Sequence, residues 1–321
     1  MLLSIIIVSY NTKSLTLQAV ESAQKDIDQS KLLANQTEII VVDNNSGDDS
    51  VEALKKNPSL KIITNQKNLG FAAANNQGIK IAQGQYLLLL NSDTIVQTGA
   101  LEALVKTLQS HPLDDTSSAL RYNEQAIDRL GIISAQLQNP DHSIQPEGGS
   151  LPSLITLFNQ MLFLDDLPII GKKLPSSQET GRRYQSASTQ LINKGWVAGT
   201  AMMIRREVIN EIGDLDENIF MYGEDVEFCL RASSHHWDIA EMATAKIIHL
   251  GSASSSSAQA IKGELKAYLY IWSKHFPVWQ MPFLKLIIKL GCGLRLIVFG
   301  TMRVDLKRRQ VYKELLSGNF N

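Results

Sequence analysis

Two aspartates lie at or just after the ends of apolar runs. Side chains at such positions could take part in chemistry. The aliphatic run Tyr86–Leu90 leads through a short polar turn to Asp93, and the run Glu38–Asp43 ends in Asp43 itself. Continuous apolar runs of this kind predict strands covered on both faces, and parallel sheets bind ligands at the carboxyl ends of their strands. One aspartate at such a place is as easily a turn or cap residue. Two on the same rim favour a binding site.

The usual phosphate-binding loops are missing. The first predicted strand is followed by the segment from Ser9 to Lys13, which has no GxGxxG turn, and no GxxxxGK[ST] loop occurs in the chain. A nucleotide diphosphate would therefore find no glycine-rich backbone cradle. A divalent metal held by carboxylates is the natural substitute.

Two later segments carry further candidate groups. Glu224 and Asp225 stand at the start of the predicted helix Val226–Ala232. Acids there suit the helix dipole and need be no more than capping residues, but a carboxylate in this position is also well placed as a general base. His249 ends the predicted strand Ala245–His249, where both a rim histidine and a metal ligand fit.

The first third of the chain alternates between strand and helix patterns. The predicted strands are Leu2–Tyr10, Glu38–Asp43, Leu60–Thr64 and Tyr86–Leu90, and the predicted helices are Ser14–Lys25, Ser50–Lys56 and Phe71–Gln83. This alternation predicts an α/β fold, with a doubly wound parallel sheet and right-handed crossovers. The small residues of the third helix, around Asn75, would let a ligand approach it closely, and close packing on the sheet explains them equally well.

The rest of the main fold is less regular. We expect a helix at Gly99–Gln109, a strand at Gly131–Leu137, a strand at Gly195–Arg206 and a helix at Glu207–Ile212. Between residues 111 and 194 the periodicity weakens. Loops often carry recognition, so this region could bind a second substrate or be a disordered insertion.

Composition sets outer limits on function and location. The 321 residues include 31 basic and 32 acidic side chains, a net charge of -1 that argues against nucleic-acid binding. Two cysteines, no cysteine–histidine cluster and no leader pattern at the N-terminus predict a reducing, cytoplasmic setting. The most apolar segment, Phe283–Phe299, contains three basic residues and falls short of a spanning helix.

From Ala258 onward the chain is basic, and its apolar residues recur at helical spacing. Such a segment could lie on the anionic inner face of a membrane. A helix pair packed on the main domain, with its lysines in solvent, is an equally good interpretation.

Taken together and in order, the motifs resemble the inverting family-2 glycosyltransferases, especially the rhamnosyltransferase-like members. The resembling segments are IIIVSYN, VVDNNSGDDS, NLGFAAANNQGI, YLLLLNSD, GWVAGTAMMIRR, DLDENIFMYGEDVEFCLR and HLGS. The resemblance implies a GT-A fold, which is a Rossmann-like, mostly parallel sheet with flanking helices, here with a C-terminal helical extension. It also implies transfer, with inversion, of a sugar from a nucleotide-diphosphate sugar to an acceptor hydroxyl.

The resemblance implies a role for each candidate residue. Asp225 matches the catalytic base, and Asp93 and His249 look like ligands of Mg²⁺ or Mn²⁺. The implied donor-binding residues are Tyr10, Asn11, Asp43, Asn75, Ser92 and Asp93. The implied acceptor or sugar pocket contains Trp196, Gly199, Thr200, Glu224 and Arg231.

One departure from the family's pattern and one missing motif refine these expectations. Asn91 stands where the family's DXD motif begins with aspartate, so a metal role for Asn91 is in doubt. The chain has no QxxRW motif of a processive synthase, which predicts transfer of a single sugar, from dTDP-rhamnose or a UDP-sugar, to a polysaccharide or lipid-linked glycan. A sugar nucleotidyltransferase and a non-catalytic recruitment domain remain as alternatives. We expect a nucleotide-sugar half (1–98), an acceptor-binding and catalytic half of the same domain (99–257) and a basic helical extension (258–321).

Overall fold

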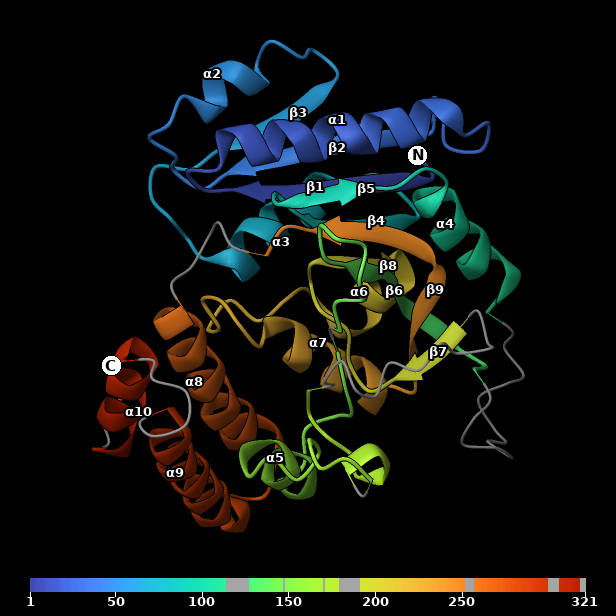
Figure 1. The fold of residues 1–321 in the computed structure, drawn as a ribbon. Coiled ribbons are helices and arrows are strands. Elements are labelled where there is room, and N and C mark those ends of the chain that lie inside the picture. Colours follow the sequence, from blue (N-terminus) through green and yellow to red (C-terminus); the bar gives the residue numbers. More distant parts are fainter. Residues whose placement is uncertain are drawn as a thin grey trace.

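The computed structural model describes residues 1–113, 127–146, 148–169, 171–178, 191–251, 257–299 and 306–317. One mixed sheet runs through the main part of the molecule, and a group of helices from the C-terminal segment lies at the end remote from strands β1 to β3 (Figure 1). The sheet order is β3-β2-β1-β4-β8-β6-β9-β5, and β7 pairs with β9 off this path.

The first half of the sheet is parallel, as the alternating pattern predicts. Its strands are β1 (Leu3–Ser9), β2 (Thr37–Asp43), β3 (Leu60–Thr64) and β4 (Tyr86–Asn91). The connecting helices are α1 (Lys13–Gln29), α2 (Ser50–Leu54) and α3 (Phe71–Ile81). Because β1 and β4 run parallel, residues that follow Ser9 and Asn91 arrive at the same edge.

The second half brings antiparallel strands into the same sheet. Strand β8 (Ala201–Arg205) runs antiparallel to β4 and to β6 (Leu130–Gln138), and β9 (Asp238–His249) pairs in parallel with β6. Two short edge strands, β5 (Thr94–Val96) and β7 (Leu191–Lys194), pair antiparallel with β9. The predicted nucleotide-sugar and catalytic halves therefore share one continuous sheet.

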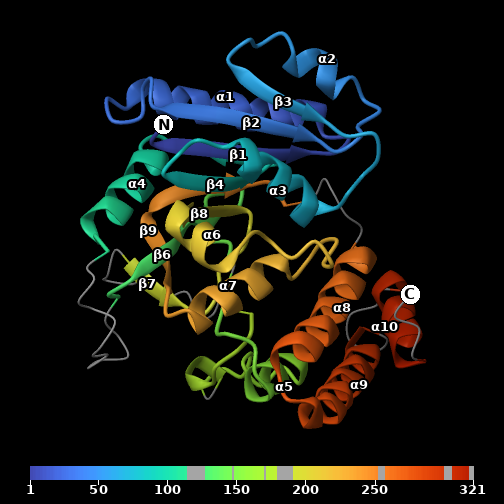
Figure 2. The ribbon, with the colours of Figure 1, turned by 180° about the vertical axis from the view of Figure 1, so that it is seen from behind.

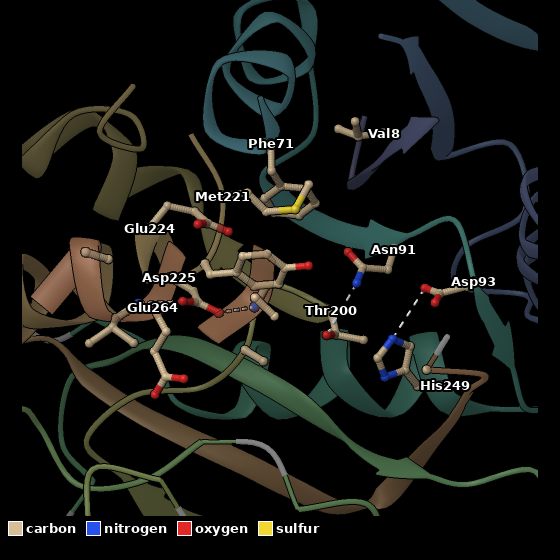
Figure 3. Close-up of a pocket in the computed structure, with 18 of the residues that line it drawn as sticks. Val8, Phe71, Asn91, Asp93, Thr200, Met221, Glu224, Asp225, His249 and Glu264 are labelled. Carbon is tan, nitrogen blue, oxygen red and sulfur yellow. Dashed lines mark hydrogen bonds and ion pairs between the residues drawn. The ribbon is translucent and has the colours of Figure 1, made fainter. Parts of the chain in front are cut away.

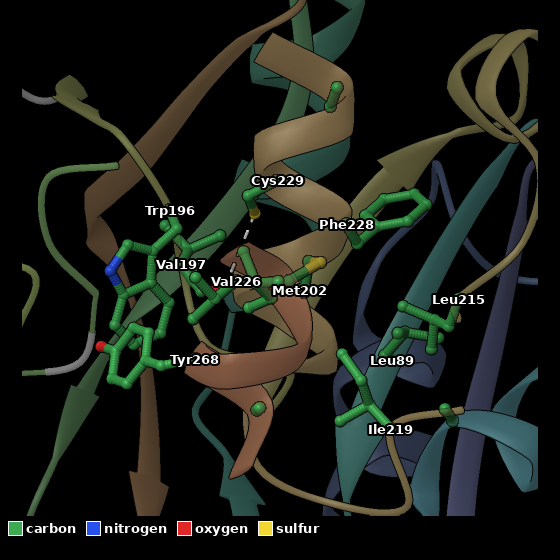
Figure 4. Close-up of a cluster of buried hydrophobic side chains, with 14 of the residues drawn as sticks. Leu89, Trp196, Val197, Met202, Leu215, Ile219, Val226, Phe228, Cys229 and Tyr268 are labelled. Carbon is green, nitrogen blue, oxygen red and sulfur yellow. Dashed lines mark hydrogen bonds between the residues drawn. The ribbon is translucent and has the colours of Figure 1, made fainter. Parts of the chain in front are cut away.

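Apolar clusters cover both faces of the sheet because side chains alternate along each strand. Ile5 and Ile7 of β1 pack under helices α1 and α4 (Ala100–Ser110), while Ile6 packs into the opposite cluster. Helix α7 (Glu224–Ser234) anchors that opposite cluster through Phe228 and Cys229, which are fully buried (Figure 4). The remaining helices and helical turns of the main domain are α5 (Leu154–Met161), α6 (Arg206–Ile212) and the 3-10 turn η2 (Gly171–Lys173).

The structure differs from the predicted elements at one point that matters for the site. The predicted strand Gly195–Arg206 begins only at Ala201, because the preceding residues form a loop. A Cβ at Gly195 would lie 2.2 Å from the Leu151 backbone nitrogen, so only glycine lets the loop pass there. Strand β5, directly after Asp93, was not among the predicted elements.

The C-terminal segment packs on the main domain, as the second interpretation expects, but its described residues form three helices rather than a pair, and Lys274 is ion-paired with Asp216 and Glu227 instead of being free in solvent. It forms α8 (Ser257–His275), the turn η3 (Val278–Gln280), α9 (Met281–Ile297) and α10 (Leu306–Leu316). Tyr268, Ile271 and Trp272 of α8 are at most 4 % exposed and belong to the same apolar cluster as α7. Both views place these helices together (Figures 1 and 2). Within the described ranges, no helix is long and apolar enough to cross a membrane.

Candidate active site

A pocket of about 480 Å³ lies beside the carboxyl ends of β1 and β4 (Figure 3). Residues from the start of α7 and from α8 also line it. Its lining includes most of the residues singled out in the sequence: Tyr10, Ser92, Asp93, Trp196, Gly199, Thr200, Glu224, Asp225 and His249. Segments far apart in the chain therefore meet in one cavity. Four of the predicted site residues are outside the lining: Asn11, Asp43, Asn75 and Arg231.

Asp93 and His249 face each other on one side of the pocket. The His249 Nε2 atom lies 3.3 Å from Asp93 Oδ1, and the His249 Nδ1 atom lies 3.0 Å from Gln145 Oε1. Because an amide oxygen only accepts, Nδ1 donates to it, and Nε2 is the ring nitrogen that faces Asp93. Pairing of Thr94 in β5 with His249 in β9 brings the two residues together.

Asp225 lies on another side of the same pocket, in the first turn of α7. Its Oδ2 accepts the Gly199 backbone N–H at 3.1 Å, and its Oδ1 accepts the Val226 N–H at 2.8 Å. Hydrogen bonds from backbone donors favour an ionised carboxylate. The loop before β8 therefore holds Asp225 in place, and Gly199 permits this because a Cβ there would already be 3.2 Å from the Phe71 ring.

Glu224 has a very different environment from its neighbour. It is 4 % exposed and its Oε2 is buried without a hydrogen-bond partner among the described residues. Burial, and then the adjacent Asp225 charge, raise the pKa of Glu224 to about 8. At neutral pH Glu224 is thus mainly a neutral acid that can donate a hydrogen bond.

A third carboxyl group enters the pocket from the C-terminal segment. Glu264 of α8 lines the pocket and accepts a hydrogen bond from Gln160 Nε2 at 3.3 Å. Burial is the main cause that raises the pKa of Glu264. Glu264 was not among the predicted site residues, although an acid one turn before Tyr268 on the buried face of an amphipathic helix was an available signal.

The remaining lining residues missed in the sequence are mostly uncharged. Phe71 and Met221 close one side of the cavity (Figure 3), Tyr268 contributes from α8, and Gln145 orients His249. No lysine or arginine lines the pocket in the part of the chain that the structure describes. A diphosphate bound here would need a positive partner from elsewhere, since burying phosphate charge uncompensated is costly.

Asp43 and Asn11 lie beside the pocket. Asp43 is 2 % exposed, its Oδ2 accepts the Ser46 N–H at 2.9 Å, and its Oδ1 is buried with no partner within the described ranges. The Asn11 side chain accepts the Gly47 N–H at 2.8 Å and so ties the loop after β2 to the end of β1. The orphan Oδ1 marks a place where a ligand donor would be favourable.

Asn75 and Arg231 make contacts away from the pocket. Asn75 is fully buried in α3 and donates to the Phe71 carbonyl at 3.0 Å. Arg231 binds both carboxylate oxygens of Glu227 at 3.0 Å through Nε, and its terminal nitrogens donate to the carbonyls of Ile212 and Asp214. Arg231 is thus ion-paired with Glu227. Its place in the sugar pocket stays a prediction.

The fold and the site define a class of protein. The sequence profile described as "Glycosyl transferase family 2" matches residues 4–213, and the chain belongs to this family. The family predicted from the motifs is therefore confirmed, as are the α/β fold class and the prediction of a glycosyltransferase enzyme. The nucleotidyltransferase and non-catalytic alternatives are set aside.

Similar proteins place the chain within that class. The "N-acetylglucosaminyl-diphospho-decaprenol L-rhamnosyltransferase" of Mycobacterium tuberculosis is 23% identical over 291 residues, covering 84% of this chain and 86% of the relative. The "UDP-Glc:alpha-D-GlcNAc-diphosphoundecaprenol beta-1,3-glucosyltransferase WfaP" of Escherichia coli is 31% identical over 141 residues, covering 43% and 52%.

A solved structure supports the GT-A fold. The mannosyltransferase PcManGT from Pyrobaculum calidifontis, in complex with GDP-Man and Mn²⁺, superposes with a TM-score of 0.54. The match has 12% sequence identity and covers 99% of this chain and 86% of that one. At this identity the likeness shows the fold alone.

Proposed function

We propose that this enzyme transfers one sugar, with inversion, from a nucleotide-diphosphate sugar to a hydroxyl of a glycan or lipid-linked acceptor. One observation carries the proposal: the pair Asp93 and His249 lies on one side of a single pocket, and Asp225 lies on another (Figure 3). Inverting transfer needs two groups placed in this way. One stabilises the leaving diphosphate, and the other deprotonates an acceptor that attacks from the opposite face of the sugar.

The residues present fit a divalent cation on the leaving-group side. An imidazole nitrogen and a carboxylate oxygen 3.3 Å apart are ligand types that suit a metal ion placed to contact both. Mg²⁺ needs only one or two carboxylates, with phosphate oxygens and water completing its shell. Bound Mg²⁺ or Mn²⁺ would offset the negative charge of the diphosphate, for which the described lining offers no lysine or arginine.

The nucleoside part of the donor would lie at the ends of β1 and β2. Asp43 Oδ1, buried and without a partner among the described residues, would accept an N–H of a pyrimidine base. Tyr10 would flank the base and ribose, and Asn11, with the loop it holds, would shape the same end of the pocket. We retain Asn75 and Ser92 as donor-binding residues, Asn75 through the helix start at Phe71.

Asp225 would act as the general base. As the acceptor oxygen forms its bond to the anomeric carbon, its proton passes to Asp225, and the bond from that carbon to the diphosphate oxygen breaks. The electron pair of that bond leaves with the nucleoside diphosphate. A positioned base of this kind contributes about 10²–10⁴-fold in rate. Glu224, neutral at pH 7, would donate a hydrogen bond to substrate without competing for the proton.

The acceptor would enter between the Trp196–Thr200 loop and α8. Trp196, Gly199 and Thr200 line this part of the pocket, as does Glu264 from the C-terminal segment. We propose a lipid-linked acceptor because both relatives described above are named for lipid-diphosphate acceptors. The donor would be dTDP-rhamnose or a UDP-sugar, and residues 258–321 would bring the enzyme to the inner membrane face.

A donor screen with two variants tests the proposal. Wild-type protein and Asp225→Asn are incubated with dTDP-rhamnose or UDP-sugars, with Mn²⁺, Mg²⁺ or a chelator, and thermal protection and donor turnover are measured. We expect metal-dependent protection by one donor in both proteins, with turnover lower by about 10²–10⁴-fold in Asp225→Asn.

Asp28→Asn serves as the matched control, because Asp28 is exposed on α1, accepts a hydrogen bond only from Gln24 among the described residues and lies outside the pocket lining. Full turnover by Asp225→Asn would show that Asp225 is not the base. Protection that is unchanged by the chelator would contradict the metal site.

A further inference from the structure

Helix α9 is apolar on two faces, and only one of them is packed against protein. Its inward face contacts α5, α8 and α10, and Leu284, Ile288 and Cys292 on that face are at most 1 % exposed. On the other face the large apolar side chains are about half exposed or more. This second face, which we call the outer stripe, consists of Phe283 (53%), Leu286 (53%), Leu290 (49%) and Ile297 (61%).

The outer stripe is continuous along the helix. At about 100° per residue its four side chains fall within an arc of roughly 60°, and at about 1.5 Å per residue they extend over roughly 20 Å. Trp279 of η3, which is 62% exposed, packs edge-on against Phe283 with ring centroids 6.2 Å apart. Val278 beside it is 88% exposed. A contiguous apolar strip of this length is unlike the scattered apolar residues of ordinary surfaces.

Positive charge accompanies the stripe on α9 and α10. Lys285 and Lys289 are exposed on one flank of α9, about 60–100° around the helix from Leu286, and no acidic residue occurs between Met281 and Ile297. At the far end, Arg309 and Lys313 of α10 line a hollow together with Ile297. An apolar strip flanked by cations is complementary to a surface that is apolar inside and anionic outside.

We propose that the outer stripe docks this enzyme on an anionic lipid bilayer, with α9 lying in the plane of the headgroups. Phe283, Leu286 and Leu290 would enter the acyl boundary, while Lys285 and Lys289 would contact lipid phosphates. Trp279 would sit at headgroup depth, where its amphipathic ring is favoured. A protein partner would bury the apolar residues of the stripe. An anionic bilayer would bury them too, and it would also explain why the charged residues of α9 are all cations.

The docking that we propose rests on the proposed function for its purpose, which is to bring the enzyme to a lipid-linked acceptor. Helix α8, which carries Glu264 and Tyr268 into the pocket, continues through η3 directly into α9. Helix α8, which lines the acceptor side of the pocket, is thus joined directly to α9, which would contact the lipid. Docking would hold the pocket mouth at a defined height above the membrane.

Vesicle flotation of the full chain tests the surface without any sugar substrate. Vesicles of phosphatidylcholine with phosphatidylglycerol are compared with phosphatidylcholine alone. We expect binding only to the anionic vesicles, weakened by salt. Leu286→Ser combined with Leu290→Ser should lower the partition coefficient by about 100-fold, at roughly tenfold per leucine. Lys285→Gln combined with Lys289→Gln should lower it by about 30-fold.

Matched controls separate docking from general damage. Ile81→Ser removes an exposed apolar residue (42%) of α3, and Lys55→Gln with Lys56→Gln removes two exposed lysines after α2. Each control should float like the wild type, and all variants should keep the wild-type circular dichroism. The proposal is overturned if the stripe variants float like the wild type. It is also overturned if light scattering shows a dimer that the leucine variants dissociate while anionic vesicles bind none of the proteins. Because flotation needs no donor or acceptor, its outcome is independent of the transfer assay.

Discussion

Glu224 and Asp225 are neighbours in the chain but have different surroundings. Asp225 accepts two backbone N–H groups, whereas Glu224 is enclosed and leaves one oxygen without a partner among the described residues. Two carboxyl groups whose environments differ in this way can divide the roles of base and neutral donor. The division is a property of single residues, and it predicts a measurable dependence of stability on pH.

Glu224→Gln should remove a loss of stability at high pH. In the folded protein the pKa of Glu224 is about 8, against an ordinary value of 4.5. Between these values the folded state holds a proton that the unfolded state has released, so the free energy of unfolding falls as pH rises, and above the folded pKa the loss is complete. Glutamine cannot ionise, so it makes no such pH-dependent contribution to the free energy of unfolding. Thermal midpoints from about pH 5 to about pH 9 should therefore fall less steeply in Glu224→Gln than in the wild type.

The exposed Glu52 of α2 provides the control, and Glu52→Gln should follow the wild-type curve. An unchanged slope in Glu224→Gln would mean that Glu224 ionises in the folded state as readily as in the unfolded one.

At the scale of elements, the start of α7 decides where the two neighbouring carboxyl groups of the pocket lie. Gly223 precedes the helix with a φ of 109°, a conformation that side-chain-bearing residues rarely adopt. A Cβ at this position would lie 2.5 Å from the Cβ of Ala267 in α8. The close contact of two helix segments therefore sets the position of Glu224 and Asp225, and Gly223 makes it possible.

Gly223→Ala should cost both stability and activity. The backbone strain amounts to about 1–2 kcal/mol, and the overlap with α8 adds about 1–3 kcal/mol. Gly99→Ala is a matched comparison, since Gly99 also precedes a helix with positive φ (82°), but a Cβ added there would meet no atom of the described residues within 4 Å. Urea unfolding should show a clearly larger loss for Gly223→Ala, and only this variant should lose turnover. Equal losses in the two variants would argue against the helix contact.

At the scale of the whole molecule, the C-terminal segment is part of the core. Trp272 is 1 % exposed and stacks on Phe276 with ring centroids 4.5 Å apart, and Tyr268 lies beside Trp196 in the cluster under α7 (Figure 4). The matching family profile ends at residue 213, yet α8 both closes the pocket and completes the apolar cluster. The extension cannot be treated as a detachable tail.

Deletion of residues 258–321 should abolish cooperative folding. The deletion removes Leu265, Tyr268, Ile271 and Trp272, each at most 4 % exposed. Burying one such side chain contributes about 1.5–3 kcal/mol, so together they approach the typical stability of a domain, about 5–15 kcal/mol. Circular dichroism on heating should show no sharp transition in the shortened chain. Trp272→Ala in the full chain should lower the free energy of unfolding by about 3–5 kcal/mol. A shortened chain with the wild-type midpoint would contradict the prediction, and membrane docking is for this reason tested by point variants.

Much of the fold follows from sequence because its signals are local. Apolar runs such as Tyr86–Leu90 and their alternation with helical patterns identify the parallel strands, and a parallel sheet delivers residues like Asp93 to one edge whatever else surrounds it. The helix predicted at Val226–Ala232 also follows from local pattern, although α7 begins two residues earlier, at Glu224. These features depend on neighbours in the chain, which the sequence contains.

Tertiary structure decided which side chains meet. His249 reaches Asp93 because β5 pairs with β9, and Glu264 reaches the pocket because α8 packs across α7. Arg231, about one and a half helix turns from the α7 residues that line the pocket, pairs instead with Glu227. Such outcomes depend on packing between segments far apart in the chain. Complementary shape and burial stabilise these contacts, and local periodicity does not reveal them. The sequence therefore determined the strand end that leads to Asp93 and the helix start that carries Asp225, and only the folded chain determined which side chains lie opposite them.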